Sequence, residues 1–242
     1  MKSFLLIPNL TREKTEGLLR ETKEILERLG AESDVCPDGS FDKDRSYDGV
    51  IFIGGDGTML RSSHTALELG VPRVGINAGS LGYYSRIKED ELEEKLPRLV
   101  KDEYSLEECA LLTADGKRAV VNDLVAMVKG SIATFIVIRQ GGREIYRTVS
   151  SGIIVSTTIG STGINRSAGG AVLQNGAEIL EITPILPNRG EKSPLVLSVR
   201  DGIELSWNAP AEVKCDGESL GIPGDVINIK PYGKKLKLID LK

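Results

Sequence analysis

The sequence predicts an α/β N-terminal domain with a doubly wound sheet, followed by a β-rich C-terminal domain that is antiparallel and sandwich-like. In the first hundred residues, short apolar runs alternate with amphipathic helical patterns, which is typical of a parallel sheet covered by helices. After about residue 101 the chain consists of short β-rich runs separated by turn signals such as Ala114-Asp115-Gly116 and Gln140-Gly141-Gly142. We therefore expect domains at residues 1–100 and 101–242, with the last strand able to return to the first domain.

The N-terminal half opens with a buried strand at Phe4–Ile7 and a helix that begins near Thr11, a suitable N-cap, and stops at Gly30. A polar stretch at residues 34–48 is expected to be a loop with one edge strand. A second strand at Val50–Ile53 follows, and the next helix begins after the glycines and ends at Gly70.

The rest of this half contains a third strand at Val71–Ile76, a loop at residues 77–83 and a charged helix from Glu89 to Val100. The C-terminal half contains ten β-rich runs: Leu106–Leu112, Val120–Lys129, Ile132–Arg139, Glu144–Ser150, Ile153–Ser156, Glu178–Pro184, Leu195–Val199, Gly202–Trp207, Ala211–Cys215 and Val226–Lys230. The Gly/Ser/Thr-rich loop at Thr157–Gly170 is long for a hairpin, which indicates a functional or helix-starting segment.

Composition limits the function classes. The chain has 242 residues, 27% of them charged, and a formal net charge of −4, so no overall positive field draws it to nucleic acid or to an anionic membrane. An anionic substrate must instead be held by backbone N–H groups, a few Lys or Arg side chains and a metal ion. The three cysteines are widely spaced and odd in number, which fits neither a disulfide framework nor a zinc site. No apolar run reaches the roughly 18–20 residues of a membrane span, and we expect a soluble, cytoplasmic protein.

The turn Gly54-Gly55-Asp56-Gly57-Thr58 joins a buried strand to a helix, which is where ligands with phosphate groups bind in α/β folds. Its carboxylate suits a base for a hydroxyl, a magnesium ligand or a helix N-cap, and a plain strand-to-helix turn with an Asp cap also remains open. The turn lacks the lysine of a P-loop and the third glycine of a dinucleotide fingerprint. The single histidine, His64, lies within the helix after the turn and is expected to be an ordinary helical residue.

Several segments in order resemble motifs of the NAD kinase family. The matching segments are Gly54–Thr58 (family GGDGT), Asn77–Tyr83 (N-x-G-x-L-G-F), Asn122-Asp123 (Asn-Glu or Asn-Asp), Ser151–Thr157 with Gly160-Ser161-Thr162 and Ser167–Gly170 (DG, GSTAY and SAGG), Ile182–Pro187 (I-T-P-I-x-P) and Cys215–Glu218 (DGQ). The match extends from about Phe4 to Lys242. GGDGT alone also occurs in diacylglycerol and sphingosine kinases, so the ordered set carries the resemblance.

This resemblance implies an active site in the crevice between two domains, where the γ-phosphate of ATP passes to the 2′-hydroxyl of the adenosine ribose of NAD. Asp56 would be the catalytic residue that accepts or orients the hydroxyl proton. The implied binding residues are Gly55, Gly57, Thr58, Asn77, Asn122, Asp123, Ser151, Thr162, Gly163, Ile164 and Ser167. Mg²⁺ or another divalent cation would be held through substrate phosphates, with Asp56 as an additional candidate ligand, and the family implies a homodimer or homotetramer.

The chain departs from the family motifs mainly on the acceptor side. Ser151 replaces an Asp, Ile164 replaces the Tyr of GSTAY, and Thr158-Ile159 replace Pro-Thr; Asn188 stands near a position where many members carry His. Two alternatives therefore stay open: a kinase of the same fold with another hydroxylated acceptor, and a non-catalytic nucleotide-binding regulator.

Overall fold

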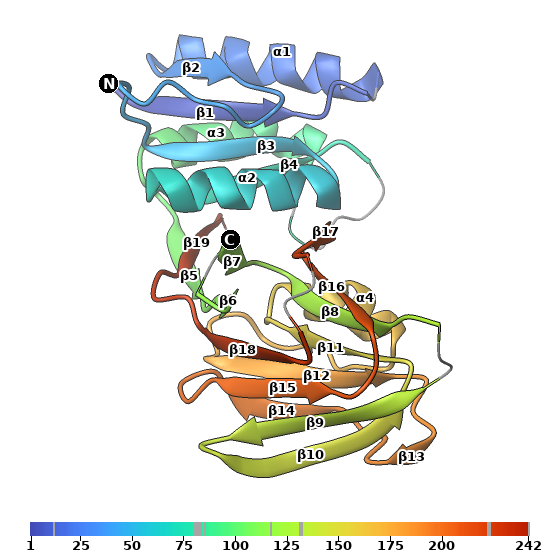
Figure 1. The fold of residues 1–242 in the computed structure, drawn as a ribbon. Coiled ribbons are helices and arrows are strands. Elements are labelled where there is room, and N and C mark those ends of the chain that lie inside the picture. Colours follow the sequence, from blue (N-terminus) through green and yellow to red (C-terminus); the bar gives the residue numbers. More distant parts are fainter. Residues whose placement is uncertain are drawn as a thin grey trace. The chain divides into compact units, whose positions relative to one another are not determined.

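The computed structural model describes residues 1–11, 13–79, 84, 86–116, 118–130, 133–221 and 224–241. It divides into two compact units: residues 1–108 together with 236–242, and residues 109–235. Figure 1 labels the helices and strands of each unit. In the described part of the chain, no helix is both long enough and apolar enough to cross a membrane.

Six strands form the sheet of the first unit, in the order β2-β1-β3-β4-β19-β5. Their bounds are Ser3–Pro8 (β1), Glu32–Val35 (β2), Gly49–Gly54 (β3), Arg73–Asn77 (β4), Ser105–Cys109 (β5) and Leu236–Asp240 (β19). The recorded pairings among β1 to β4 are all parallel, and β19 pairs in parallel with β4. Every residue of β3 is buried, as expected for a strand in the middle of a parallel sheet.

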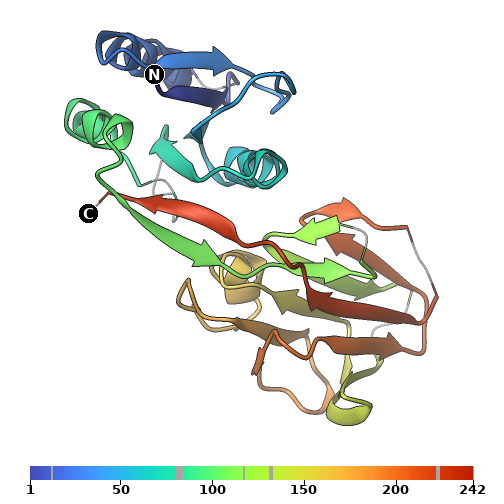
Figure 2. The same cartoon turned by 90° about the vertical axis from the view of Figure 1, so that its left-hand side faces the viewer.

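Helices cover both faces of this sheet. They are α1 (Glu13–Arg28), α2 (Asp56–Leu69) and α3 (Leu92–Val100), which follows the short 3₁₀ turn η1 (Glu89–Glu91). Figure 2 shows α1 (blue) and α3 (green) on one face of the sheet and α2 (cyan) on the other. Side chains of α1 and α3, including Leu18, Ile25, Leu92 and Leu96, share one apolar core with the strands. The predicted doubly wound α/β arrangement is confirmed.

Two antiparallel sheets form the second unit. The seven-stranded sheet has the order β13-β10-β9-β15-β18-β6-β7, and the six-stranded sheet has the order β14-β12-β11-β8-β16-β17. The strands of the first are Arg189–Gly190 (β13), Arg143–Ser150 (β10), Thr134–Gln140 (β9), Ile203–Trp207 (β15), Val226–Pro231 (β18), Leu112–Ala114 (β6) and Arg118–Val120 (β7). Those of the second are Leu195–Ser198 (β14), Ile179–Ile185 (β12), Gly152–Ser156 (β11), Asp123–Val128 (β8), Ala211–Cys215 (β16) and Glu218–Ser219 (β17).

The recorded pairings in both sheets are antiparallel. One apolar core contains side chains from both, such as Ile136 and Leu205 from the first sheet and Ile153 and Leu180 from the second. The sandwich-like architecture predicted for this half is therefore confirmed. Between β11 and β12 lie the 3₁₀ turn η2 (Gly160–Thr162) and the short helix α4 (Ile164–Ser167).

The strand predicted at Leu106–Leu112 was wrong as a single element. The structure has two strands there, β5 and β6, and they belong to different sheets. Because β5 joins the sheet of the first unit, the units divide between residues 108 and 109 rather than between 100 and 101. The run expected at Ile132–Arg139 begins outside the described residues, and the described strand starts at Thr134.

Candidate active site

The turn between β3 and α2 places Asp56 at the first position of the helix. Gly55 is the N-cap, with φ −107° and ψ −162°, and its carbonyl oxygen accepts the N–H groups of Thr58 and Met59 at 3.0 Å each. Asp56 is exposed and is not the N-cap, so the capping alternative is wrong. Its carboxylate lies at the positive end of the α2 dipole, where an incoming phosphate group would also be attracted.

Gly54 and Gly57, which flank the Gly55-Asp56 pair, are explained by different physical requirements. A Cβ atom at Gly54 would lie 2.6 Å from Thr58 Oγ1, so the close packing of the turn on buried Thr58 requires glycine there. A Cβ atom at Gly57 would meet no atom of the described residues within 4 Å. Gly57 therefore leaves open backbone beside Asp56, which is the environment that a ligand approaching the main chain needs.

Asn77 lies at the same edge of the sheet as this turn. It ends β4 and is the register partner of Gly54 across the β3–β4 pair. Its Oδ1 accepts the N–H of Gly79 at 3.0 Å, which closes a local Asx turn. The remainder of the predicted N-x-G-x-L-G-F loop, residues 80–83, lies outside the described residues.

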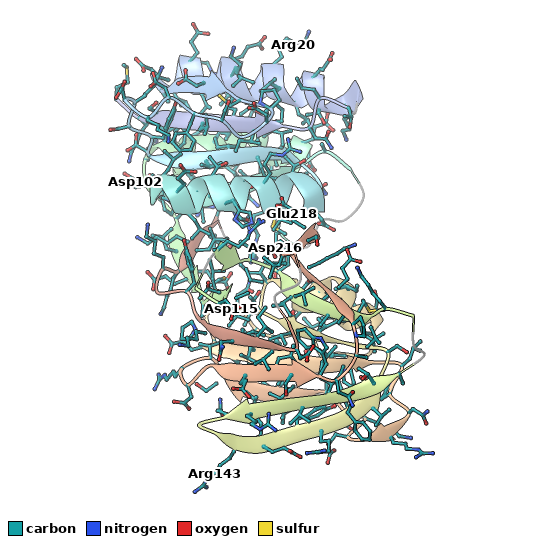
Figure 3. The ribbon with its side chains drawn as sticks, in the orientation of Figure 1. Arg20, Asp102, Asp115, Arg143, Asp216 and Glu218 are labelled. Carbon is teal, nitrogen blue, oxygen red and sulfur yellow. The ribbon has the colours of Figure 1, made fainter. Side chains whose placement is uncertain are left out.

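In the second unit, the carboxylate of Asp216 holds the backbone of the Asn122-Asp123 segment. It accepts three consecutive N–H groups, from Val121 at 2.9 Å, Asn122 at 2.7 Å and Asp123 at 3.3 Å. The N–H of Asp216 returns a hydrogen bond to the Asp123 carbonyl at 2.9 Å. Figure 3 labels Asp216 at the turn after β16. Charge-assisted bonds of this kind are stronger than neutral ones, so the segment is firmly placed.

The start of the loop after β11 is attached to the same segment. Thr157 donates its hydroxyl to the Val121 carbonyl at 2.5 Å and its N–H to the Asn122 carbonyl at 2.9 Å. The same hydroxyl accepts the N–H groups of Ile159 and Gly160 at 3.1 Å each. A Cβ atom at Gly160 would lie 2.0 Å from the Asn122 carbonyl oxygen. Glycine is therefore required where this loop crosses the Asn122 backbone.

Asn122 and Asp123 present two oxygen acceptors that the rest of the described chain does not use fully. Asn122 Oδ1 is buried and has no hydrogen-bond partner among the described residues. Asp123 is also buried, with 8% of the residue exposed. Burial, reinforced by the nearby Asp216 carboxylate, raises the pKa of Asp123 to about 6. A buried acceptor without a donor is costly, so a ligand that brings hydroxyl donors fits this pair.

The other predicted residues of the second unit fall into two places. Thr162, Gly163, Ile164 and Ser167 lie together on η2 and α4, with the Ile164 side chain 48% exposed. Ser151 lies between β10 and β11, and its N–H donates to the Ile185 carbonyl at 3.0 Å.

Ser151 is not grouped with Asn122 and Asp123. Asp123 pairs with Ser156 at the far end of β11, so the strand separates Ser151 from the acceptor pair by roughly 16 Å at about 3.3 Å per residue.

Asp216, Thr157 and Gly160 are site-building residues to which the sequence interpretation gave no role. The signal available in the sequence was the turn-forming pair Asp216-Gly217 between two β-rich runs. In the structure both residues have positive φ, +52° and +82°. That signal predicts a turn but not the distant backbone that its carboxylate reaches.

A preformed metal site is absent from the part of the chain that the structure describes: no group of three or more His, Cys, Asp or Glu side chains is arranged to hold an ion there. His64 lies half-buried on α2, as expected for an ordinary helical residue. Asp56 is one exposed carboxylate and can supply one or two oxygen ligands. This donor set fits a divalent cation that arrives bound to substrate phosphates.

Comparison with known protein families gives two matches that together span most of the chain. The ATP-NAD kinase N-terminal domain matches residues 6–104, and the ATP-NAD kinase C-terminal domain matches residues 111–240. An NAD kinase from Ruminiclostridium cellulolyticum is 30% identical and covers 99% of this chain and 93% of its own length.

Solved structures also resemble the chain. An NAD kinase from Archaeoglobus fulgidus, determined in complex with ATP, has a TM-score of 0.82 at 26% identity and covers 100% of this chain and 94% of its own. A yeast NADH kinase complexed with NADH has a TM-score of 0.84 at 19% identity, over 100% of this chain and 84% of its own, which shows a shared fold.

Proposed function

The chain belongs to the NAD kinase family, phosphotransferases with an alcohol acceptor, and on this premise we propose that it transfers the γ-phosphate of ATP to the 2′-hydroxyl of the adenosine ribose of NAD, making NADP. The observation that carries the proposal is the exposed carboxylate of Asp56 at the first turn of α2, beside the open backbone at Gly57. A nucleotide-binding regulator without catalysis would gain from losing a carboxylate that repels phosphates, which favours an enzyme over that alternative.

In the proposed reaction the ribose hydroxyl oxygen attacks the γ-phosphorus, the bond between that phosphorus and the β,γ-bridging oxygen breaks, and ADP leaves. Asp56 accepts the proton that the hydroxyl gives up, or orients the hydroxyl for attack. Gly55, Gly57 and Thr58 shape the turn that faces the phosphates. Transfer of this kind depends mainly on positioning and on charge neutralisation. One carboxylate at a helix N-terminus is therefore enough as the catalytic side chain.

Asn122 and Asp123 are proposed to hold the hydroxyls of the NAD ribose. Both side chains offer oxygen acceptors, and the orphaned Oδ1 of Asn122 gains a donor when a hydroxyl binds. Asp216 fixes their backbone, so the two acceptors are in place before the substrate arrives. Thr162, Gly163, Ile164 and Ser167 are proposed to surround the adenosine half, while Ser151 and Asn77 remain proposed contacts at more distant positions.

Mg²⁺ or another divalent cation is proposed to enter with ATP. It would be held by the substrate phosphates, with Asp56 as an additional candidate ligand. When bound, it would neutralise charge on the transferring phosphoryl group.

Family membership also supports a homodimer or homotetramer, which light scattering of the purified protein would measure. The described cysteines, Cys36, Cys109 and Cys215, are all free thiols, and this supports the proposed cytoplasmic location.

The direct test is NADP formation from NAD and ATP by the purified protein, followed with an NADP-specific coupling enzyme. We expect turnover that depends on a divalent cation and on both substrates. ATP consumption without NADP, in a screen of nucleosides and sugars, would transfer the assignment to another hydroxylated acceptor. If neither NADP nor ATP consumption rises above the background of Asp56→Asn, the proposal is wrong.

We expect binding of NAD to weaken in acid because of Asp123. Its carboxylate accepts ribose hydroxyls more strongly, and through both oxygens, when it is ionised, and its pKa is raised to about 6. The kcat/KM for NAD should therefore be flat above about pH 7 and fall as the pH drops through about 6. An Asp123→Asn variant should be weaker at neutral pH and should lack this inflection.

The stability of the fold gives an independent control for the pH experiment. As the pH falls, the contribution of Asp123 to stability rises, whereas the expected kcat/KM for NAD falls. A carboxyl whose pKa is higher in the folded chain, about 6, than its ordinary value of 3.8 takes up its proton preferentially when folded. Between these pH values Asp123 thus favours folding more as the pH falls, and a loss of kcat/KM cannot come from this group unfolding the protein. The same inflection in Asp123→Asn would contradict the assigned role.

A further inference from the structure

Two side chains on the outer face of β12 are polar and yet buried. Leu180 and Ile182 point into the core between the two sheets, so the alternation of a strand directs Glu181 and Thr183 to the opposite face. Glu181 is 1% exposed and Thr183 is 0% exposed. The partners of both are residues of the loop between β11 and β12, which carries Thr162, Gly163, Ile164 and Ser167. A buried carboxylate at this point therefore faces the loop of the proposed dinucleotide site.

Asn165 joins this loop to the sheet. Its Nδ2 donates to Glu181 Oε2 at 2.6 Å, and its Oδ1 accepts the Thr183 hydroxyl at 2.7 Å. The second carboxylate oxygen, Glu181 Oε1, accepts the N–H of Ala171 at 2.9 Å. Both ends of the Asn165 amide and both oxygens of Glu181 are therefore used. Asn165 itself is 0% exposed.

The turn that ends the loop is built around the Asn165 side chain. The N–H of Gly170 donates to the Asn165 carbonyl at 2.9 Å, and Gly169 has φ +95°. A Cβ atom at Gly170 would lie 2.2 Å from Asn165 Nδ2. The second glycine of the SAGG segment is thus required because the Asn165 amide fills the space above it. The loop is held from inside at Asn165 and at its end at Ala171.

Attaching a loop through a buried carboxylate costs free energy, because the carboxylate loses its contact with water. Among the described residues, Glu181 receives hydrogen bonds from Asn165 and Ala171 only, and no cation pairs with it. Apolar side chains of similar size often replace a buried charged group without loss of stability. What an apolar pair cannot supply is a directional contact that specifies one loop conformation.

We propose that Glu181 and Asn165 are positioning residues that hold the loop at residues 160–171 in its binding conformation before the dinucleotide arrives. This inference rests on the proposed function, because it assigns that loop to the adenosine half of NAD. The two residues act through the loop and do not contact the reacting atoms.

A donor–acceptor exchange tests the pairing. In Asn165→Asp, two carboxylates face each other at the 2.6 Å contact, and we expect the KM for NAD to rise by about tenfold or more, because hydrogen bonds to charged groups are strong. The KM for ATP and kcat should change by less than about twofold, since the loop is assigned to NAD alone. In the double variant Asn165→Asp/Glu181→Gln, the amide and the carboxylate exchange places and all three hydrogen bonds can form again. We expect it to restore the KM for NAD.

A second double variant, Asn165→Leu/Glu181→Leu, keeps the test decisive if Asn165→Asp does not fold. It removes the buried carboxylate but leaves the Ala171 N–H and the Thr183 hydroxyl without these acceptors, so we expect it to fold with a lowered melting temperature and to show a raised KM for NAD. Tyr146→Phe is the matched control, because it deletes one partly buried hydrogen bond of the same unit, to the Ser193 carbonyl at 2.8 Å, outside the loop. Its KM for NAD should equal that of the wild type.

Hydrogen exchange separates this inference from the proposed function. If the wild type forms no NADP, the function is wrong, but the amides of residues 160–171 should still exchange faster in the Leu/Leu variant than in the wild type or in Tyr146→Phe. The inference is overturned if the Leu/Leu variant folds with wild-type loop exchange, or if it folds with a wild-type KM for NAD. It is also overturned if Asn165→Asp folds with a raised KM that the Glu181→Gln exchange leaves unrepaired.

Discussion

Replacing Asp56 by asparagine is expected to lower kcat for NADP formation by about 10²- to 10⁴-fold, the usual contribution of a general base. The change removes the proton acceptor and keeps the size of the side chain. Asp56 is exposed at the first turn of α2, so the fold should survive, with a loss of about 1 kcal/mol at most from the helix dipole. Steady-state kinetics with both substrates varied, together with thermal melting, would measure these effects.

Glu68→Gln is the matched control for Asp56→Asn, because it removes one exposed carboxylate at the other end of the same helix. Its kinetics should equal those of the wild type. If Asp56→Asn also weakens binding of ATP with its cation, Asp56 serves as a metal ligand rather than as a base. A kcat within about tenfold of the wild type, together with unchanged binding of ATP and its cation, would contradict both roles.

Replacing Gly160 by alanine is expected to destabilise the second unit by about 3 kcal/mol or more and to abolish binding of NAD. The new Cβ atom would lie 2.0 Å from the carbonyl oxygen, 2.4 Å from the carbonyl carbon and 2.8 Å from the Cα of Asn122. All three are backbone atoms of a segment that Asp216 and Thr157 hold in place, so no side chain can rotate away to make room. Relief requires the loop to leave Asn122, which separates the two parts of the proposed NAD site.

Thermal unfolding would measure this effect, with an expected fall in melting temperature of about 6–12 °C for a chain of this size. Gly163→Ala serves as the control for the melting experiment, because it lies in the same loop and its Cβ atom would approach only the Gly160 carbonyl oxygen, at 3.3 Å. We expect it to cost less than about 1 kcal/mol. If Gly160→Ala melts with the wild type, the contact between the loop and Asn122 is not required for folding.

Much of the fold was readable from local pattern. The apolar run Val50–Ile53, the glycines after it and the stop at Gly70 predicted β3 and α2 closely, because strand burial, turn geometry and helix termination depend on neighbouring residues. The prediction of one strand at Leu106–Leu112 was wrong because the two strands within this run pair in different sheets. Pairing between strands far apart in the sequence leaves no periodic signal.

The residues of the site also divide into those that local motifs predict and those that only the folded structure reveals. Asp56, Asn122 and Asp123 lie in short motifs whose residue types already suggest a chemistry. The role of Asp216 was not readable, because its carboxylate meets backbone groups 93 to 95 residues away. Nor did the sequence set Asn165 apart from other polar residues of its loop, or Glu181 from those of the β-rich segments, since only burial and the 2.6 Å contact make them a pair.

By itself, the sequence determined the two kinds of domain, the family and the presence of a carboxylate in the GGDGT turn, because these depend on local order along the chain. The tertiary structure alone decided that Gly55 and not Asp56 caps α2, that Asp216 and Thr157 hold the acceptor pair, and that Glu181 faces the loop. These features depend on which groups meet in space and on which of them lose their water. A hydrogen bond or a buried charge is therefore a property of the folded arrangement, whereas a turn or an amphipathic helix is already a property of the segment.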